Sequence, residues 1–437
     1  MGAPRKGSAD ADRADEHLDE LARLADTAGA TVVGRLLQRI DKPTPRYFIG
    51  EGKVEELKER LTAEQATLVF FDEGLSPAQG VGLEKALGVR VMDRSEVILD
   101  IFATRARSHE ARLQVELAQL EYLLPRLQRM WTHLSRIRGG VGLRGPGETQ
   151  LETDRRAIRR KISALRHKLA HVSEHRANQR QGRERREVPS AALVGYTNAG
   201  KSSLLRALSG DDVFVEDRLF ATLDTLSREV DVGEGYGVRV TDTVGFIRKL
   251  PHHLVASFRA TLEEAEDADI LLHVIDASAP AWEEQVEVVE EAMRNAEFGM
   301  RNENTIHVFN KADLLPDPDA FIVRVCERFP RAVLASTIPH SALRIPHSDH
   351  SALRIPHSVD NLRAALRTSV QSLRPLAHVR VPLSDGKLLA ALHRDAEVVE
   401  QVEEDGVLRV TVRVEAKLLG RLRREGVEVV VGGEGIG

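Results

Sequence analysis

The chain has 437 residues, 42% hydrophobic and 4% aromatic content, and a formal net charge of −5 at pH 7. The length accommodates roughly three domains, and the apolar content is typical of soluble domains with packed cores. The single cysteine, Cys326, excludes a disulfide framework and a cysteine-based zinc site, and the few aromatics argue against base stacking as the main mode of binding nucleic acid.

The N-terminal region combines a polar leader with an alternating pattern. Residues 1–13 are small, polar and charged, which predicts disorder. Strand-like runs at 31–37, 67–72 and 89–93 alternate with helix-like runs, which predicts a small α/β domain with a mainly parallel sheet over residues 1–108. Since residues 1–20 lack an apolar core, and no apolar run approaches the ~20 residues that span a bilayer, we expect a cytoplasmic protein.

Residues 109–187 carry two heptad patterns of apolar residues. The first runs from Leu113 to Leu134 and the second from Leu151 to Val172, with a glycine-rich break at 139–147 between them. Two such helices predict an antiparallel hairpin whose tip is the glycine-rich stretch. Pro125 is expected to kink the first helix.

The second of these helices is strongly basic. A solvated helix face is the ordinary explanation of a charge run, but acidic i,i+4 partners are sparse here. We therefore favour an arm that contacts phosphates of RNA. The residues expected to contact RNA are Arg144, Arg155, Arg156, Arg159, Arg160 and Lys161.

The centre of the chain carries the phosphate-binding loop G-x-x-x-x-G-K-S. An apolar run at 191–194 leads into it and a helix-like run at 203–208 leads out. In that context backbone N–H groups and a helix dipole face the phosphates. Lys201 is expected to reach the β- and γ-phosphates, and Ser202 to bind Mg²⁺. The nucleotide-binding residues predicted here are Gly195, Tyr196, Thr197, Asn198, Ala199, Gly200, Lys201, Ser202 and Ser203.

Two further segments follow in the order that a GTPase requires. The sequence LFATLD at 219–224 offers Thr222 as the switch residue that closes on Mg²⁺ and the γ-phosphate. A strand-like run then ends in DTVG at 242–245, where Asp242 should hold Mg²⁺ through water and the Gly245 N–H should meet the γ-phosphate. These segments contribute Phe220, Ala221, Thr222, Leu223, Asp224, Asp242, Thr243, Val244 and Gly245 to the predicted site.

A third motif, N-K-x-D, predicts guanine as the base. Asp313 can accept hydrogen bonds from N1–H and N2–H₂ of guanine, a pattern that adenine lacks. Asn310 is expected to support the loop and Lys311 to pack its stem over the ring, with Ala312 between them. The motif therefore favours GTP over ATP.

Phe246 stands directly after DTVG, where many regulatory GTPases carry a glutamine that orients the attacking water. A phenyl ring cannot hydrogen-bond that water. One interpretation is slow intrinsic hydrolysis that a partner accelerates, and the other is that Phe246 simply packs beneath the loop.

With these motifs in place, residues 30–374 resemble the HflX family of translational GTPases. The resemblance rests on DEGLSPAQ at 72–79, DIFATRA at 100–106, LQVELAQL at 113–120, GGVGLRGPGETQLETDRR at 139–156, and the GTPase motifs above. It implies a cytoplasmic, Mg²⁺-dependent GTPase that binds the large ribosomal subunit and its rRNA near the peptidyl-transferase region. It also implies a role in splitting stalled or idle ribosomes under stress, with suggested links to subunit maturation.

The chain departs from the family pattern in one loop. The last guanine-side loop of the family reads S-A-x-x-G, and the matching region, 334–340, assigns Ser336 and Thr337 to that role. The segment HSALRIPHSD at 340–349 then recurs as HSALRIPHSV at 350–359. We interpret 338–359 as a low-complexity insertion whose duplication, rather than metal binding, explains its histidines.

These patterns together predict a multidomain α/β protein. We expect the N-terminal domain at 1–108, the hairpin at 109–187, a P-loop GTPase domain with a mainly parallel sheet at 188–374, and a small α/β domain at 375–437. A monomer is expected off the ribosome. Two alternatives remain: a GTP-switched assembly or signalling factor that splits nothing, and a nucleotide-driven RNA remodeller that uses the glycine-rich turn at 49–53.

Overall fold

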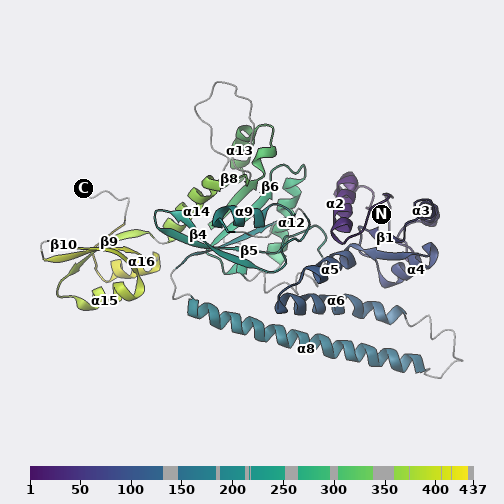
Figure 1. The fold of residues 1–437 in the computed structure, drawn as a ribbon, viewed down its shortest axis with the longest axis horizontal. Helices are drawn as coiled ribbons and strands as arrows, with labels where there is room; N and C mark the ends of the chain where they lie inside the picture. The colour runs from purple at the N-terminus through teal and green to yellow at the C-terminus, as the bar shows by residue number, and fades with distance from the viewer. Residues whose placement is uncertain are drawn as a thin grey trace.

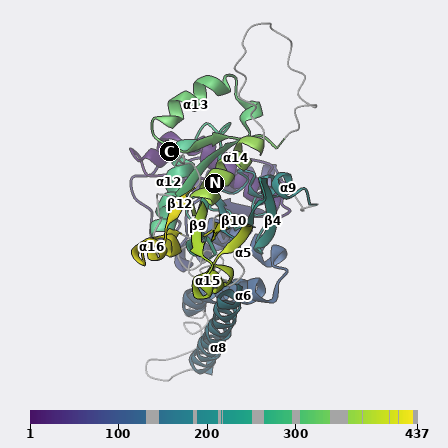
Figure 2. The same ribbon diagram turned by 90° about the vertical axis from the view of Figure 1, so that its left-hand side faces the viewer.

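The computed structural model describes residues 1–130, 146–183, 188–211, 216, 218–250, 264–295, 304–337, 359–373, 375–404, 406–414 and 416–431. The molecule is elongated, with a central GTPase domain between the N-terminal and C-terminal domains (Figure 1). A pair of long helices runs beneath the GTPase domain and the N-terminal domain (Figures 1 and 2). Among the described helices, none is long and apolar enough to span a membrane.

The N-terminal domain contains a short parallel sheet covered by helices. Strand β1 (Leu68–Phe71) pairs with β2 (Arg90–Asp93), as the alternating pattern predicted. Its helices are α1 (Ala9–Asp12), α2 (Ala14–Thr27), α3 (Glu51–Ala63), α4 (Pro77–Leu87) and α5 (Arg94–Arg105).

Local sequence explains where these helices begin. Ser76 and Gln79 form a reciprocal capping box at the start of α4, with Pro77 in the first turn. The side chain of Asp93 caps α5 by accepting a hydrogen bond from the Glu96 N–H. Within the glycine-rich segment 49–53, Gly50 is the N-cap of α3 and residues 51–53 form its first turn, where Lys53 is paired with Glu56 at 2.9 Å.

The expectation that residues 1–13 are disordered is wrong. The Met1 ammonium group donates to the Phe70 carbonyl at 2.7 Å, and the Asp72 N–H donates to the Met1 carbonyl at 3.0 Å. Met1 and Ala3 are buried in the core of the N-terminal domain. The segment is therefore held along the edge of β1 by backbone hydrogen bonds that its polar composition did not predict.

The strand expected at 31–37 is also absent from the described structure. Residues 1–5 lie beside 36–40, with the Gly2 N–H donating to the Leu36 carbonyl at 3.0 Å. Residues 1–5 therefore lie between β1 and the segment 36–40, and residues 31–35 join no strand of the described structure. Val32 and Val33 are 42% and 51% exposed.

The two heptad patterns form a helical pair. Helix α6 (His109–Met130) packs against α8 (Pro146–Arg183), and the two run antiparallel (Figure 1). Leu113, Leu117, Ile162 and Leu165 form the buried seam between them. Helix α6 continues through Pro125. The glycine-rich stretch expected at the tip lies outside the described residues, as does Arg144.

The GTPase domain is built on a six-stranded sheet in the order β4-β5-β3-β6-β7-β8. Only β4 and β5 pair antiparallel; the other neighbours are parallel. The predicted P-loop motifs follow the carboxyl ends of parallel strands, so they meet at one edge of the sheet. The elements are β3 (Ser190–Gly195), α9 (Lys201–Ser209), β4 (Leu226–Gly233), β5 (Tyr236–Asp242), β6 (Ile270–Asp276), α12 (Trp282–Asn295), β7 (Thr305–Asn310), the 3₁₀ helix η2 (Ala312–Leu314), α13 (Pro318–Cys326), β8 (Ala332–Leu334) and α14 (Val359–Leu373). Of the predicted insertion at 338–359, residues 338–358 lie outside the described residues.

The C-terminal domain is a small α/β unit with an antiparallel sheet in the order β10-β11-β9-β12. Arg413 joins it to the GTPase domain by donating to the Glu234 carbonyl at 3.0 Å and lying 4.2 Å from the centre of the Tyr236 ring. The sequence did not predict β10, whose glutamates mask its strand pattern. The elements are β9 (Leu376–Pro382), α15 (Gly386–Asp395), β10 (Glu397–Glu404), β11 (Val407–Arg413), α16 (Ala416–Arg424) and β12 (Val429–Val431).

Candidate nucleotide-binding site

The phosphate loop bends tightly between β3 and α9, and its glycines are required by close contacts. Gly195 has φ of 155° and Gly200 has φ of 94°. A side chain at Gly195 would collide with the Val274 carbonyl, and one at Gly200 with the Asn310 amide. The Asn310 Nδ2 donates to the Ala199 carbonyl at 2.9 Å, so the base-side motif supports the phosphate loop directly.

Lys201 is buried at the first turn of α9. Its ammonium group donates to the carbonyls of Gly195 and Tyr196 at 3.1 and 3.0 Å. Burial lowers the pKa of Lys201 to about 8, against the opposing influence of Asp242. The loop therefore already folds around the cation that the motif assigns to the β- and γ-phosphates.

Three oxygens meet where Mg²⁺ is expected. The Ser202 hydroxyl donates to Asp242 Oδ2 at 2.6 Å and lies 2.7 Å from the Thr222 hydroxyl. Asp242 Oδ1 is buried and has no hydrogen-bond partner in the described part of the chain. Burial raises the pKa of Asp242, although Lys201 and Ser202 favour its charged form. Hydroxyl and carboxylate oxygens with one unsatisfied lone-pair site fit a hard cation such as Mg²⁺.

The DTVG segment lies against the phosphate loop. A side chain at Gly245 would come within 2.7 Å of the Thr197 Cα and 3.0 Å of the Lys201 ammonium group, so only glycine fits there. The Thr197 N–H donates to the Phe246 carbonyl at 2.7 Å, and the Phe246 N–H donates to the Gly195 carbonyl at 3.0 Å. The backbone of this segment and that of the loop are thus fixed to each other.

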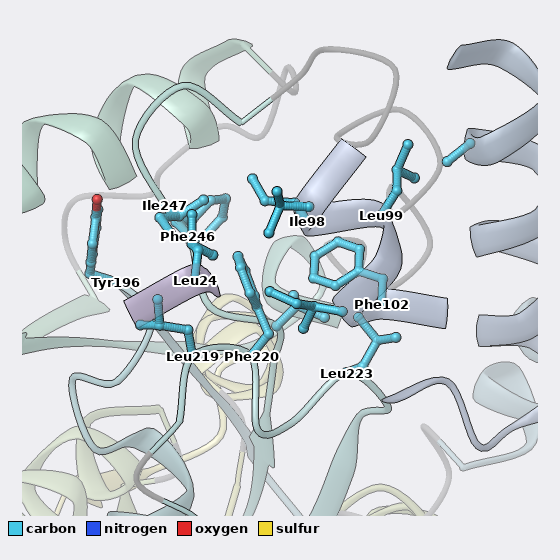
Figure 3. Close-up of a cluster of buried hydrophobic side chains, with 14 of the residues drawn as sticks. Leu24, Ile98, Leu99, Phe102, Tyr196, Leu219, Phe220, Leu223, Phe246 and Ile247 are labelled. Atoms are coloured by element: carbon cyan, nitrogen blue, oxygen red, sulfur yellow. The ribbon is translucent and has the colours of Figure 1, made fainter. Parts of the chain in front are cut away.

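The Phe246 side chain turns away from the nucleotide cavity. It is 3% exposed and belongs to a cluster shared by the GTPase domain and the N-terminal domain (Figure 3). The cluster includes Phe220, which meets the Phe102 ring of α5 edge to face at 4.7 Å. This placement agrees with the packing interpretation of Phe246 and leaves the rate of hydrolysis as a separate question.

The guanine-side residues converge as well. The Ser336 hydroxyl donates to Asp313 Oδ1 at 2.6 Å. The Lys311 ammonium group contacts Asp276 Oδ2 at 2.6 Å, and the Ala312 N–H donates to the Ala335 carbonyl at 3.1 Å. The loop after β8 therefore lies next to the N-K-x-D motif, as the assignment of Ser336 requires.

A cavity of about 500 Å³ joins these parts. Most predicted residues line it, but the side chains of Tyr196, Leu223 and Asp224 contact the N-terminal domain or the root of α6 instead. Three lining residues, Glu216, Arg218 and Leu314, were missed, since no motif marks them; Glu216 is paired with Arg105 of α5 at 2.6 Å. The predicted residues on the wall are Thr197, Asn198, Gly200, Lys201, Ser202, Ser203, Phe220, Ala221, Thr222, Thr243, Gly245, Asn310, Lys311, Asp313 and Thr337.

The basic residues predicted on the hairpin are largely available at its surface. Arg156, Arg159 and Arg160 are exposed on α8, and they form no ion pair within the described residues. Lys161 is also exposed but is paired with Glu116 of α6 at 2.5 Å, and Arg155 is half-buried. Arg156, Arg159 and Arg160, more than Lys161, are available to a partner.

Comparison with known proteins settles the family. Residues 15–103 match the family described as GTP-binding GTPase N-terminal, 105–183 the GTP-binding GTPase Middle Region, and 190–311 the 50S ribosome-binding GTPase. The GTPase HflX of Magnetococcus marinus is 44% identical over 417 residues, covering 94% of this chain and 92% of that one. The chain belongs to the HflX family of GTPases. The GTPase HflX of Escherichia coli is 42% identical over 400 residues, covering 91% and 90% of the two chains.

Membership in the HflX family establishes the reaction as hydrolysis of GTP. A solved GTP-binding protein from Sulfolobus solfataricus in complex with GDP covers 85% of this chain and 99% of its own, at 22% identity and a TM-score of 0.43.

Proposed function

We propose that this HflX-family GTPase binds the large ribosomal subunit in its GTP-bound form and separates stalled or idle ribosomes under stress. The observation that carries the proposal is the arrangement around the nucleotide cavity. Both segments expected to sense the γ-phosphate contact the N-terminal domain or the hairpin root. The match to a family described as 50S ribosome-binding GTPase supports the choice of partner.

The hairpin supplies the surface for RNA. Arg156, Arg159 and Arg160 are exposed and lie within about one helical turn of one another on α8. Guanidinium groups bind phosphates in two-pronged geometry, and several of them together give strong, salt-dependent attraction to rRNA. The buried seam with α6 keeps this surface rigid.

The nucleotide site supplies the switch. Asp313 would select guanine, while Lys201 and the N–H groups of the loop would bind the phosphates. Ser202, Thr222 and Asp242 would hold Mg²⁺, which neutralises charge on the β- and γ-phosphates when it is bound. A γ-phosphate would draw the Thr222 and Gly245 segments toward itself, and its loss would release them.

Hydrolysis in the isolated protein is expected to be slow. The buried Phe246 side chain cannot orient the attacking water from the position directly after Gly245. Ribosome binding would then accelerate turnover by reordering these segments, after which the GDP form would leave the subunit.

Light scattering of intact ribosomes tests the proposal. Adding the protein with a non-hydrolysable GTP analogue should lower the scattering as ribosomes separate, whereas GDP should not. The triple variant R156Q/R159Q/R160Q should lose the effect, and the control variant K387Q/R423Q/R424Q, which removes three exposed cations from the C-terminal domain, should keep it. Ribosome binding without any change in scattering would instead favour an assembly or signalling factor.

A further inference from the structure

Two cationic side chains shortly after Phe246, those of Arg248 and Lys249, extend from the GTPase domain and contact the N-terminal domain. The Arg248 guanidinium lies 3.1 Å from Asp72 Oδ2, and the Lys249 ammonium group lies 2.9 Å from the same oxygen. Arg94 holds the other oxygen, Asp72 Oδ1, at 2.7 Å. Asp72 follows β1 and Arg94 opens α5, so two segments of the N-terminal domain converge on one buried carboxylate.

This cluster also reaches the backbone of the GTPase domain. The Arg94 Nε donates to the Arg248 carbonyl at 3.1 Å. The Arg248 N–H donates to the hydroxyl of Tyr196, a phosphate-loop residue, at 2.9 Å. That hydroxyl in turn hydrogen-bonds Glu20 of α2, which is also paired with Arg94. The N-terminal domain therefore holds the chain immediately after DTVGF and the loop beside it.

The charge of Asp72 is needed at this position. Asp72 and Arg94 are each 2% exposed. Burial favours the neutral acid, yet Arg94, Arg248 and Lys249 hold the pKa of Asp72 well below its usual range. Removing one charge from a buried, paired cluster leaves the remaining cations under-compensated, which displaces them.

We propose that Asp72 is a positioning residue for GTP hydrolysis. Through Arg248 and Lys249 it fixes the segment that carries Gly245 and Phe246 against the phosphate loop. Asp72 touches no nucleotide, since it does not line the described cavity. Its role is to keep the γ-phosphate side of the site in one geometry before the partner arrives, so that the GTPase domain depends on the N-terminal domain for turnover.

The test compares Asp72→Asn with Asp93→Asn in the full chain. Asp93 is equally buried and pairs with Arg126 at 2.7 Å, but among the described residues its hydrogen bonds lie within the N-terminal domain and α6, so it serves as the matched control. Asp72→Asn should lower kcat for GTP about tenfold while KM stays within about twofold, because misplaced segments slow chemistry more than binding. Amide exchange of the peptide spanning 244–250 should also become faster. Asp93→Asn should change neither kcat nor the rate of amide exchange in this peptide, even if it lowers the melting temperature as much as Asp72→Asn does.

A second comparison separates positioning from general loosening. Arg248→Gln should lower kcat by a similar factor, and combining it with Asp72→Asn should add little, because the two residues act through one contact. An unchanged or raised kcat in Asp72→Asn would overturn the proposal. So would an equal loss of kcat in Asp93→Asn, or fully additive effects of Asp72→Asn and Arg248→Gln.

Discussion

Asp224 accepts hydrogen bonds from the backbone N–H and the hydroxyl of Ser108, the residue directly before α6. The N–H contact is 3.2 Å, and a second N–H, from Arg107, reaches the same carboxylate at 3.0 Å. Ser108 in turn accepts from the Ala111 N–H at 3.0 Å and so caps the helix. Asp224 stands two residues after Thr222, so these hydrogen bonds join the segment proposed to bind Mg²⁺ to the root of the hairpin.

Replacing Asp224 with alanine should uncouple the nucleotide from the hairpin. The variant loses the three hydrogen bonds at the root of α6, at a cost of about 1–2 kcal/mol. We expect intrinsic GTP turnover within about twofold of the parent, but a smaller difference in large-subunit affinity between the GTP-analogue and GDP forms. Pelleting with purified subunits measures that difference. Asp231→Ala, which removes an exposed carboxylate on β4, is the control, and an unchanged difference in Asp224→Ala would contradict the coupling.

The pKa of Lys201 predicts how binding depends on pH. At pH 7 the side chain is protonated, and it becomes neutral as the pH rises through about 8. Phosphates favour the charged form, so binding above that pH must take up a proton, and the Kd for GTP should be about tenfold weaker at pH 9 than at pH 7. Lys201→Arg keeps its charge across this range. Any binding that this variant retains should be independent of pH; a parallel decline in both proteins would assign the effect elsewhere.

Asp242 should cost stability in the absence of nucleotide. Its folded-state pKa is raised, so its charge opposes folding once the pH exceeds the unfolded value. Asp242→Asn should therefore stabilise the nucleotide-free protein by about 1 kcal/mol, while abolishing the Mg²⁺-dependent part of GTP affinity.

Ser202→Ala should instead destabilise the nucleotide-free protein. It also weakens Mg²⁺-dependent binding, but it removes the 2.6 Å hydrogen bond to Asp242 and leaves a buried charge with fewer partners. Thermal melts with and without Mg²⁺ and GDP separate the two variants. A nucleotide-free Asp242→Asn protein that melts below the parent would show that the carboxylate is well satisfied.

Asp313→Asn should change which base is bound. The asparagine carbonyl can still accept from N1–H, but its NH₂ group donates to the C2 carbonyl of xanthine and cannot accept from the N2–H₂ of guanine. The affinity for GTP should fall about 100-fold, and the affinity for xanthosine triphosphate should rise by a similar factor. Ser336→Ala, which removes the 2.6 Å support of Asp313, should cost GTP only severalfold. Competition with a fluorescent nucleotide ranks all three proteins.

The convergence of the nucleotide-binding motifs could be predicted from sequence because each motif is short and follows a strand. Gly195, Asp242 and Asn310 end β3, β5 and β7, so local patterns alone bring them to one edge of the sheet. The helical hairpin could be predicted for the same reason, because its heptad patterns are local. Such patterns report the helix or strand in which a residue lies and the face that it turns to the core.

The contacts between domains could not be predicted in this way. Asp72 and Arg248 are 176 residues apart, and no local sequence pattern in either segment predicts that they pair. The path of residues 1–13 depends on hydrogen bonds to Phe70 and Leu36, which override a polar composition. Glu216 reaches the cavity through a long-range pair with Arg105, which no motif marks. The domain boundaries and the RNA-binding set on α8 remain predictions.

Guanine nucleotide in the cavity is proposed to control whether the hairpin binds rRNA. Equilibrium binding of the full chain to purified large subunits tests it most directly, with a non-hydrolysable GTP analogue, GDP or the matching ATP analogue present. We predict tight binding with the GTP analogue alone, lost in R156Q/R159Q/R160Q and weakened by added salt. Equal affinity with all three nucleotides, or undiminished binding by the triple variant, would contradict the claim.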